Sequence, residues 1–552
     1  MRTISAKIIL VGMLLLTACA TNTGTISQKS NATTIDRPKL VVGIVVDQMR
    51  YDFLYRYWDK YGNDGFKKLL QKGYSFENAN YSYVPTYTAP GHASIYTGSV
   101  PSVNGIIANS WFDRETGKTM YCVEDKTVKT VGSTSKAGEM SPKNLLSTTI
   151  TDQLKLATNK RSKVIAVALK DRGAVLPGGY MADGAYWFDS ESGNFITSTF
   201  YRNELPQWVV AFNQQKLADK YLSQTWNTLL PIAQYNNSTA DNMPYEEGLP
   251  GKTEPVFPYD LAAIRSTDYE LLRYTPFGNT LTKDIALKAL QAEQLGKGEA
   301  TDFLSVSFSS TDYIGHDFGP NAIETEDTYI RLDREIAELL KELENTVGKD
   351  NLLVFLTADH GVANVNAYML EERVTAGAIN YNVLGDSVKA YMARNYGQGK
   401  WMEKYTNQQV YLNRKLIAEK KLNLQDVQQD VANYLSTIKG VATTITAEAL
   451  QRTSWSHGQM QLAENGYNAR RSGDVIVQLE ANWQMHGPKG TAHGSYSRHD
   501  THVPMVWYGW KVKPGQSTTY VNITDIAPTL ASWLHIQEPT GSVGKALQEY
   551  MK

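Results

Sequence analysis

The chain has 552 residues and a balanced charge, with 55 lysines and arginines against 56 aspartates and glutamates. A net charge of −1 lacks the positive excess that attracts a phosphate backbone, so we expect no nucleic-acid partner. Cys19 and Cys122 are the only cysteines, which excludes a four-cysteine zinc site. Metal ligands, if there are any, must therefore be His, Asp, Glu or hydroxyl groups.

The N-terminus has the pattern of an export signal. The apolar run 8–16 follows a basic start and is too short to remain in a bilayer as a spanning helix. Small residues then precede Cys19, as in the lipobox of bacterial lipoproteins. We predict a signal peptide over 1–18, a lipid anchor on Cys19 and a tether over 19–37, which is rich in Thr, Ser and Asn. An ordinary cleaved signal peptide is the alternative. Either pattern predicts an exported protein, and the lipobox predicts a periplasmic or outer-membrane-anchored lipoprotein of a Gram-negative bacterium.

Four apolar, β-branched runs have the composition of strands that are buried on both faces of a parallel sheet. In chain order they are residues 39–46, 163–169, 303–308 and 352–356. Helical periodicity occurs at 145–157, 281–295 and 328–343. A further strand and helix are expected at 504–508 and 523–534. This alternation predicts a doubly wound α/β fold with a mostly parallel central sheet flanked by helices.

Two regions interrupt the alternation. Residues 182–260 are rich in Tyr, Trp, Asn and Pro, and residues 366–480 carry polar helices and one strand-like run. We interpret both as insertions into one catalytic domain over 38–552, where they shape the mouth of the site.

Polar side chains follow three of the predicted strands. Asp47 follows the first strand, Asp312 and His316 follow the third, and Asp359 and His360 follow the fourth. The carboxyl ends of parallel strands meet at one edge of a sheet, so these side chains would meet there. Clustered carboxylates need a cation, which indicates a metal site. Each residue taken alone has a simpler interpretation as a helix cap, a turn residue or a solvated side chain.

Thr88 lies where a helix is expected to begin. The segment 85–95 has a Pro-Gly pair followed by residues typical of a helix, and Thr88 falls at or just before the first turn. Helix N-termini favour negative charge, so a hydroxyl placed there would form an alkoxide if it also coordinated a metal. Taken alone, Thr88 would be an N-cap. His92, one turn later, would support it from the same face.

Several motifs occur together and in order between residue 39 and the C-terminal helix. They are Asp47, Thr88-Ala-Pro-Gly-His, the D-x-x-x-H motif at 312–316, Asp359-His-Gly and Thr-Ala-His493-Gly-Ser. In this combination the chain resembles the alkaline phosphatase superfamily, and more narrowly the phosphate-irrepressible PafA-type alkaline phosphatases. The resemblance implies an alkaline-phosphatase-like fold and the hydrolysis of phosphate monoesters to inorganic phosphate.

The resemblance also implies two zinc ions per chain. The ligands of one ion would be Asp312, His316 and His493. Those of the other would be Asp47, Asp359, His360 and Thr88. Thr88 would also be the nucleophile that forms a phosphothreonine intermediate. The carboxylate-rich set leaves Mn²⁺ or Ca²⁺ open. His499 and His502 lie close to His493 in the sequence, so either is an alternative to it as a ligand.

Three further residues bear on the substrate. Asn109, Lys170 and Arg172 resemble side chains that contact phosphoryl oxygens in the PafA-type enzymes. Two cations favour a monoester, because its dianion carries more charge than a diester. Without the resemblance, Lys170 and Arg172 would be an ordinary solvated pair.

Other functions remain open at this point. A phosphodiesterase of the nucleotide pyrophosphatase type would share the metal ligands and the threonine nucleophile. A non-catalytic lipoprotein that binds a metal or a solute is the alternative outside the enzymes. A sulfatase is disfavoured, because its C/S-x-P-x-R motif is absent at Thr88. We expect a monomer that acts on small-molecule phosphate monoesters and contacts a membrane only through the lipid on Cys19.

Overall fold

The computed structural model describes residues 35–552, and the compact unit Arg37–Lys552 contains all but the first two of them. The predicted signal peptide and nearly all of the predicted tether lie outside the described residues. Those two predictions therefore remain predictions.

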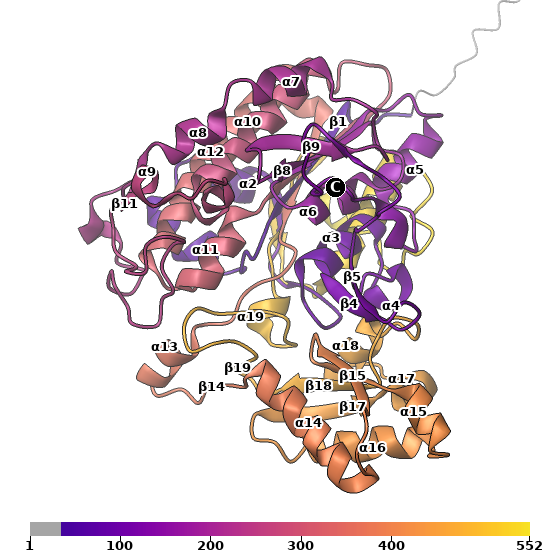
Figure 1. The fold of residues 1–552 in the computed structure, drawn as a ribbon. Helices are drawn as coiled ribbons and strands as arrows, with labels where there is room; N and C mark the ends of the chain where they lie inside the picture. Colours follow the sequence, from indigo (N-terminus) through magenta and orange to yellow (C-terminus); the bar gives the residue numbers. More distant parts are fainter. Residues whose placement is uncertain (1–34) are drawn as a thin grey trace, which may run out of the picture. The chain divides into compact units, whose positions relative to one another are not determined.

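A ten-stranded mixed sheet forms the centre of this unit (Figure 1). Its strand order is β21-β2-β20-β13-β1-β12-β7-β8-β9-β6. The neighbours β13, β1, β12, β7 and β8 run parallel, whereas β20 and β9 pair antiparallel on either side of them. The bounds are β21 Gly515–Ser517, β2 Tyr74–Phe76, β20 Met505–Gly509, β13 Leu352–Thr357, β1 Leu40–Val46, β12 Asp302–Phe308, β7 Val164–Ala168, β8 Gly184–Asp189, β9 Asn194–Ser198 and β6 Thr130–Val131. The predicted α/β fold class is confirmed.

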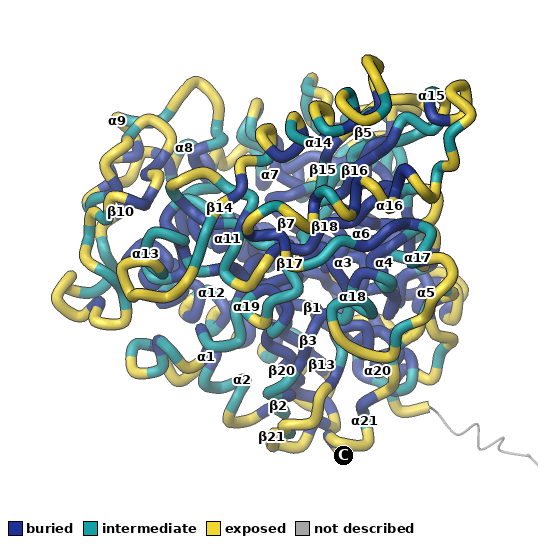
Figure 2. The backbone as a smooth tube through the Cα atoms, turned by 90° about the horizontal axis from the view of Figure 1, so that it is seen from below, coloured by how far each residue is buried: buried dark blue, intermediate teal, exposed yellow. Residues whose placement is uncertain are grey.

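The four predicted central strands are present, each within one residue of its predicted ends. These are β1, β7, β12 and β13, and every residue in them is buried, as the dark blue tube of β1 and β13 shows in Figure 2. Burial on both faces explains why these runs are continuously apolar rather than alternating.

The two faces of β7 show how the sequence selects the helices that cover the sheet. Ile165 and Val167 share a hydrophobic cluster with α10 (Phe277–Ala292). Ala166 and Ala168 point to the opposite face and pack with α6 (Asp171–Gly178) and α3 (Thr88–Thr97). The small alanine side chains let these two helices approach the sheet closely, which brings their N-termini to the ends of the strands.

The predicted helix at 145–157 starts later than expected. In the structure α5 covers Ile150–Ala157, because the Thr149 side chain accepts a hydrogen bond from the Asp152 amide and forms a capping box there. The helix predicted at 281–295 is α10, which starts and ends a few residues earlier, and the helix predicted at 328–343 extends at both ends as α12 (Ile323–Val347). The last predicted helix divides into a 3₁₀ turn, Ile523–Asp525, and α20, Ile526–Leu534.

The region predicted as the second insertion contains a separate antiparallel sheet with its own hydrophobic cluster, drawn in orange in Figure 1. Its strands are β15 (Met402–Thr406), β16 (Gln409–Leu412), β18 (Val475–Leu479) and β17 (Val441–Thr446). The helices α14 (Tyr381–Tyr396) and α16 (Leu424–Leu435) pack on it. We call residues 366–485 the inserted segment. The region 182–260, by contrast, begins with β8 and β9 of the main sheet. The domain boundaries stay a prediction.

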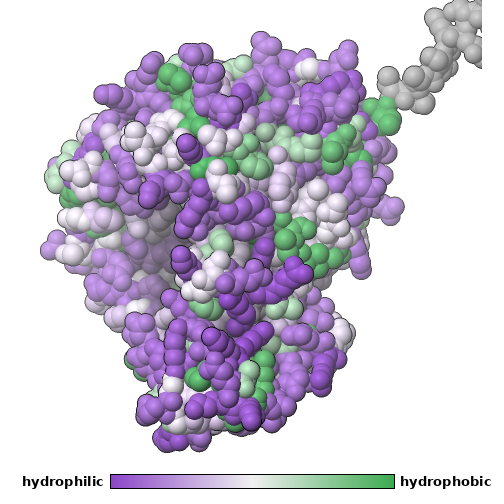
Figure 3. Space-filling model, turned by 45° about the vertical axis from the view of Figure 1, so that its right-hand side comes forward, coloured by the Kyte–Doolittle hydropathy of each residue, from purple (hydrophilic) through white to green (hydrophobic). Residues whose placement is uncertain are grey.

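The helices of the described residues do not meet the requirements of a membrane span. Among residues 35–552, no helix combines the length and the apolarity that crossing a bilayer requires. The face shown in Figure 3 is mainly hydrophilic, with the hydrophobic residues in small separate groups.

A buried carboxylate ties the inserted segment to the main body. Asp474 accepts hydrogen bonds from Arg114 at 2.9 Å, Arg414 at 2.8 Å and the Leu412 amide at 2.7 Å, and its side chain is fully buried. Arg114 follows β4 (Ser110–Asp113), whereas the other partners belong to the inserted segment. The carboxylate therefore joins two regions that are far apart in the sequence.

We predict that Asp474→Ala lowers the free energy of unfolding by about 3–5 kcal/mol, because it leaves two arginines without their buried partner. Urea denaturation measures this change. Asp386→Ala is the control, because Asp386 forms an exposed ion pair with Lys389 whose loss should barely move the midpoint. Equal midpoints for the two variants would contradict the role assigned to Asp474.

Candidate active site

Four neighbouring parallel strands each deliver one ionisable side chain to the same edge of the sheet. In spatial order, Asp359 follows β13, Asp47 follows β1, Asp312 lies in the helix after β12, and Lys170 follows β7. That helix is α11 (Ser310–Phe318). Adjacent parallel strands are about 4.8 Å apart, so their ends hold these groups within contact distance of each other.

The three carboxylates share one buried lysine. Lys170 Nζ lies 2.7 Å from Asp47 Oδ2 and 2.5 Å from Asp312 Oδ2, and all three side chains are at least nine-tenths buried. Burial opposes the charge of Lys170, but Asp312 and Asp47 raise its pKa, so the ammonium stays protonated. One positive charge therefore faces the carboxylates of Asp47, Asp312 and Asp359.

The pKa values of the three aspartates show that the single charge of Lys170 does not compensate all three carboxylates. Burial, followed by the charge of Asp312, raises the pKa of Asp47. Burial, followed by the charge of Asp47, raises the pKa of Asp359 well above its usual range. Burial acts in the same direction on Asp312, but Lys170 and His316 hold the pKa of that carboxyl well below its ordinary value. Two carboxylates thus lack a compensating cation.

The three predicted histidine ligands have the same hydrogen-bonding arrangement. His316 Nδ1 donates to the carbonyl of Thr491 at 2.7 Å, His360 Nδ1 to that of Gly361 at 2.9 Å, and His493 Nδ1 to that of Thr86 at 2.7 Å. A carbonyl can only accept, so each Nδ1 carries a proton, and in a neutral ring the lone pair is then on Nε2. Burial lowers the pKa of His316, but the charge of Asp312 raises it overall, so this ring favours the protonated form more than the other two. Burial lowers the pKa of His360 to about 3, which keeps that ring neutral.

These Nε2 atoms face carboxylate oxygens. His316 Nε2 lies 3.2 Å from Asp312 Oδ1, His493 Nε2 lies 3.6 Å from the same oxygen, and His360 Nε2 lies 3.5 Å from Asp47 Oδ1. In the neutral rings of His360 and His493, a lone pair that faces a carboxylate is repelled by it unless a cation lies between them. This orientation, with the second ring nitrogen bound to a carbonyl, is the usual one for a metal-ligating histidine.

Two groups of ligand atoms in the described residues are compact enough to hold metal ions. One is Asp47, Asp359 and His360, and the other is Asp312, His360 and His493, with ligand atoms within 4.8 Å of one another in each. The buried Asp47 Oδ1 and Asp359 Oδ2 have no hydrogen-bond partner, so the residues present fit a cation. The first group agrees with the predicted set. The second contains His360 where the prediction has His316.

The stacking of two rings accounts for that difference. His360 and His493 lie nearly parallel, with centroids 3.5 Å apart, which places a ligand atom of His360 within 4.8 Å of those of Asp312 and His493. His316 approaches Asp312 from one helical turn later in α11. Which of the two histidines completes the second group stays a prediction. His499 and His502 belong to neither group, and His502 Nε2 contacts the carbonyl of Glu77.

Thr88 is the first residue of α3 and not its cap. Tyr87 occupies the N-cap position, and no side chain makes a capping hydrogen bond there. The Thr88 hydroxyl lies 3.4 Å from His360 Nε2. At Gly91, a Cβ atom would come within 2.2 Å of the Asp359 carbonyl oxygen, so only glycine lets α3 begin this close to the end of β13.

Asn109 is fixed to the same helix terminus. Its Oδ1 accepts a hydrogen bond from the Ala89 amide at 2.9 Å, which leaves the two N–H groups of its amide free to donate elsewhere. The segment that carries it is held on the other side by Asn407 of the inserted segment, which donates to the Ser110 carbonyl at 2.6 Å.

Lys170 and Arg172 line a cavity of about 250 Å³ together with Asp312, Tyr313 and His316. Lys170 is only 3% exposed, so the interpretation as a solvated pair fails for it. Arg172 Nη1 donates to the Tyr121 hydroxyl at 3.0 Å. Burial opposes the charge of Arg172, but the pKa remains above its ordinary value, so both side chains present fixed positive charge.

Two supporting residues were missed or only partly predicted from the sequence. Gln48 donates from Nε2 to Asp312 Oδ1 at 2.8 Å and from its backbone amide to Asp359 Oδ1 at 3.1 Å, so it joins two strand ends. Its position next to Asp47 was the available signal. His92, expected to support Thr88, contacts the Thr88 carbonyl at 2.9 Å and lies 3.4 Å from Asp359 Oδ2.

Comparison with known proteins agrees with this geometry. A family model for type I phosphodiesterases and nucleotide pyrophosphatases matches residues 41–505. Alkaline phosphatase PhoV of Synechococcus elongatus is 47% identical over 94% of this chain and 94% of that protein. A protein of Myroides odoratus named a calcium-transporting ATPase is 46% identical over 93% of this chain and 95% of that protein.

Alkaline phosphatase PafA of Elizabethkingia meningoseptica is 47% identical over 95% of this chain and 96% of that protein. A crystal structure of PafA superposes with a TM-score of 0.91 at 46% identity, covering 93% of this chain and 99% of that chain. The chain therefore belongs to the type I phosphodiesterase and nucleotide pyrophosphatase family, and within the alkaline phosphatase superfamily to the group that contains PafA and PhoV.

Proposed function

We propose that this chain is a metal-dependent alkaline phosphatase that hydrolyses phosphate monoesters with Thr88 as the attacking group. One observation carries the proposal: the Thr88 hydroxyl lies at a helix N-terminus, 3.4 Å from His360, beside a buried carboxylate and histidine group whose charge is uncompensated. The names of PafA and PhoV support the same activity.

We further propose two zinc ions as the cofactor. Asp47, Asp359, His360 and Thr88 would hold one of them, and Asp312, His493 and His316 the other. Bound zinc would supply Lewis acidity that favours the ionised form of a hydroxyl and neutralises phosphoryl charge. The carboxylate and imidazole donors fit zinc, while Mn²⁺ and Ca²⁺ accept the same oxygen ligands. Metal analysis of the purified protein decides between them.

The proposed reaction has two steps, and Thr88 takes part in both. The Thr88 oxygen forms a bond to phosphorus as the bond from phosphorus to the ester oxygen breaks, and the alcohol leaves with a proton. Water then attacks the phosphothreonine, which releases inorganic phosphate and restores the hydroxyl. The dipole at the N-terminus of α3 favours the negative phosphoryl group throughout.

Lys170, Arg172 and Asn109 account for the preference for monoesters. A monoester dianion exposes three oxygens that need donors, whereas a diester has one of them esterified. The lysine and arginine supply charge-assisted hydrogen bonds, and the asparagine supplies the two N–H groups that its contact with Ala89 leaves free. The diesterase alternative would depend less on the two cations.

The N-terminal pattern supports a proposal about location. A short apolar run and small residues before Cys19 favour export and a lipid anchor, which would make the protein a monomeric lipoprotein of the periplasm or the outer membrane. Metabolic labelling with a fatty acid tests this, because Cys19→Ser should abolish incorporation.

The first experiment is hydrolysis of p-nitrophenyl phosphate against its bis-ester, with ATP as a third substrate and the metal content measured on the same sample. We expect a strong monoester preference with about two zinc ions per chain. A diester preference would favour the diesterase alternative. The absence of activity on every ester would favour a binding lipoprotein.

We predict that Thr88→Ala lowers turnover of p-nitrophenyl phosphate by at least about a thousandfold, because the attacking oxygen is removed. The metal content should fall much less than the turnover, because Asp47, Asp359 and His360 remain as ligands. Thr97→Ala is the matched control: it removes a buried hydroxyl from the same helix, bonded to the Ala93 carbonyl. Turnover of Thr88→Ala at the level of Thr97→Ala would refute the assigned nucleophile.

We predict that Lys170→Ala lowers kcat/KM for the monoester about 10–100-fold more than for the diester, which corresponds to the loss of one charge-assisted hydrogen bond. Taking the ratio of the two substrates on one protein cancels any change in metal content. Lys155→Ala is the control, because Lys155 is equally buried and is paired with Asp183. An unchanged ratio in Lys170→Ala would argue for the diesterase alternative.

A further inference from the structure

A second cavity opens beside the proposed nucleophile. It has a volume of about 270 Å³, and four of its lining residues belong to the site or adjoin it: Asn109, His316, His493 and Tyr87, which directly precedes Thr88. His316 also lines the cavity that contains Lys170 and Arg172. The two cavities therefore adjoin each other at this histidine.

The inserted segment lines this cavity with three apolar side chains, next to the polar side chains of Gln408 and Gln484. Leu479 ends β18, Trp483 lies in β19 (Trp483–Gln484), and Met485 follows it. Trp483 and Met485 are only partly buried, in contrast to the tryptophans of the main core. An apolar wall of this kind, next to a strongly polar site, matches the usual anatomy of a small-molecule pocket.

The indole of Trp483 is held in place by its surroundings. A Cβ atom at Gly377 would come within 2.7 Å of the ring, and one at Gly440 within 2.1 Å. These two glycines let the backbone lie against the indole, so the ring has little room to turn. A preorganised aromatic side chain loses little entropy when a ligand packs on it.

Tyr87 provides a second aromatic surface next to the reacting atoms. Its ring meets His493 edge to face, with centroids 5.5 Å apart and planes at 75°. Gly494 leaves space for it, because a Cβ there would lie 2.6 Å from the ring and the φ of Gly494 is +113°. The cavity thus has one aromatic ring beside Thr88 and another across from it.

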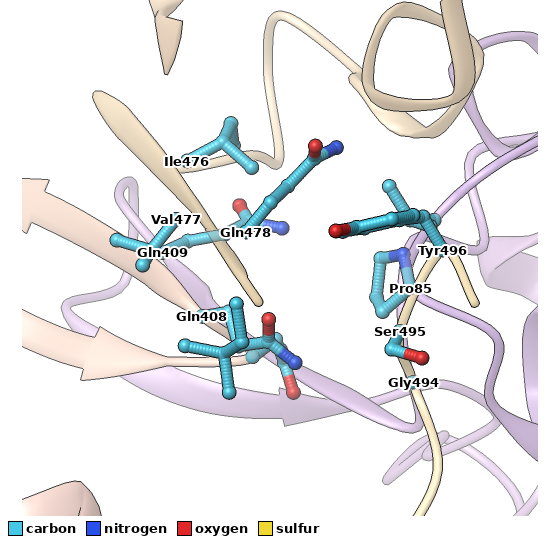
Figure 4. A pocket seen from close by; sticks show the side chains of 12 residues that line it. Pro85, Gln408, Gln409, Ile476, Val477, Gln478, Gly494, Ser495 and Tyr496 are labelled. Atoms are coloured by element: carbon cyan, nitrogen blue, oxygen red, sulfur yellow. The ribbon is translucent and has the colours of Figure 1, made fainter. Parts of the chain in front are cut away.

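The neighbouring hollow is too small for a substrate. Figure 4 shows Gln408 and Gln478 of the inserted segment on one side of it and Pro85 and Tyr496 on the other. Its volume of about 20 Å³ has room for about one water molecule. This hollow therefore does not take the organic part of an ester, and the cavity with Lys170 and Arg172 has the charges suited to the phosphoryl group instead.

We propose that the second cavity binds the alcohol part of the phosphate ester and selects for an aromatic group, with Trp483 as the main specificity-determining residue. This rests on the proposed phosphatase function. Lys170 and Arg172 would hold the phosphoryl dianion in the first cavity, with Asn109 where the second cavity adjoins it, so the second cavity is the space next to the ester group. There Tyr87, Leu479, Trp483 and Met485 favour a flat apolar ring over a small or hydroxylated alkyl group.

The test uses two non-hydrolysable probes, phenylphosphonate and methylphosphonate, as competitive inhibitors of p-nitrophenyl phosphate hydrolysis. They share one phosphoryl group and differ only in the organic part, so leaving-group reactivity does not enter. We expect wild type to bind phenylphosphonate at least about tenfold more tightly than methylphosphonate. Trp483→Ala should remove most of this ratio, whereas inhibition by inorganic phosphate should change less than about twofold.

Matched variants separate specificity from general damage. Trp455→Ala removes another partly buried tryptophan of the inserted segment that lines neither cavity, and should leave the ratio unchanged. Trp483→Phe should restore most of it. If Trp483→Ala does not fold, Met485→Ala carries the same test. Equal affinity for the two phosphonates in wild type, or an unchanged ratio in Trp483→Ala, would overturn the proposal. Failure of the phosphatase function would appear differently, as a wild type that hydrolyses no monoester.

Discussion

The arrangement of this site depends on one electrostatic constraint: three carboxylates are held at the ends of three adjacent strands with a single lysine among them. The register of β13, β1 and β12 fixes Asp359, Asp47 and Asp312 in place, so the repulsion cannot be relieved by moving one of them away. The structure accommodates the charges with Lys170 and with hydrogen bonds from Gln48. The negative charge that these contacts leave uncompensated is the reason why the site needs a cation.

Most of the central sheet could be predicted from the sequence, because strands that are buried on both faces are continuous apolar runs. The ends of the predicted strands then indicated which charged residues lie at the site. The prediction of secondary structure was less accurate where polar residues are buried. The first turns of α12 contain Glu324, Glu326 and Asp327, all buried, so hydropathy placed the start of this helix five residues too late. At α5 a local contact, the Thr149 and Asp152 capping box, outweighed the apolar periodicity. Helix ends depend on such single contacts, which periodicity does not record.

At the site, too, some residues could be predicted from the sequence and others could not. Strand-end residues could be found from the sequence, since their position follows from the sheet. The position of Asn109 could not, because its side chain is held by the Ala89 amide and the next residue, Ser110, by Asn407 of the inserted segment. The proton positions on the three histidines also depend on carbonyls from distant loops, at Thr491, Gly361 and Thr86. The inserted segment was expected to shape the mouth of the site, but only the fold shows that Leu479, Trp483 and Met485 form a wall there.

The charges of the site also indicate why a monoester suits it better than a diester. With two divalent cations bound, the proposed metal charge would exceed what three carboxylates remove, and Lys170 and Arg172 would add to that excess. A diester monoanion would leave much of this positive charge unbalanced in a buried site, whereas a dianion, with the ionised Thr88 oxygen, would offset it. The uncharged wall formed by Trp483 and its neighbours then meets the only part of the substrate that carries no charge. The positive charges would thus hold the phosphoryl group of the ester, and the apolar side chains would hold its organic group.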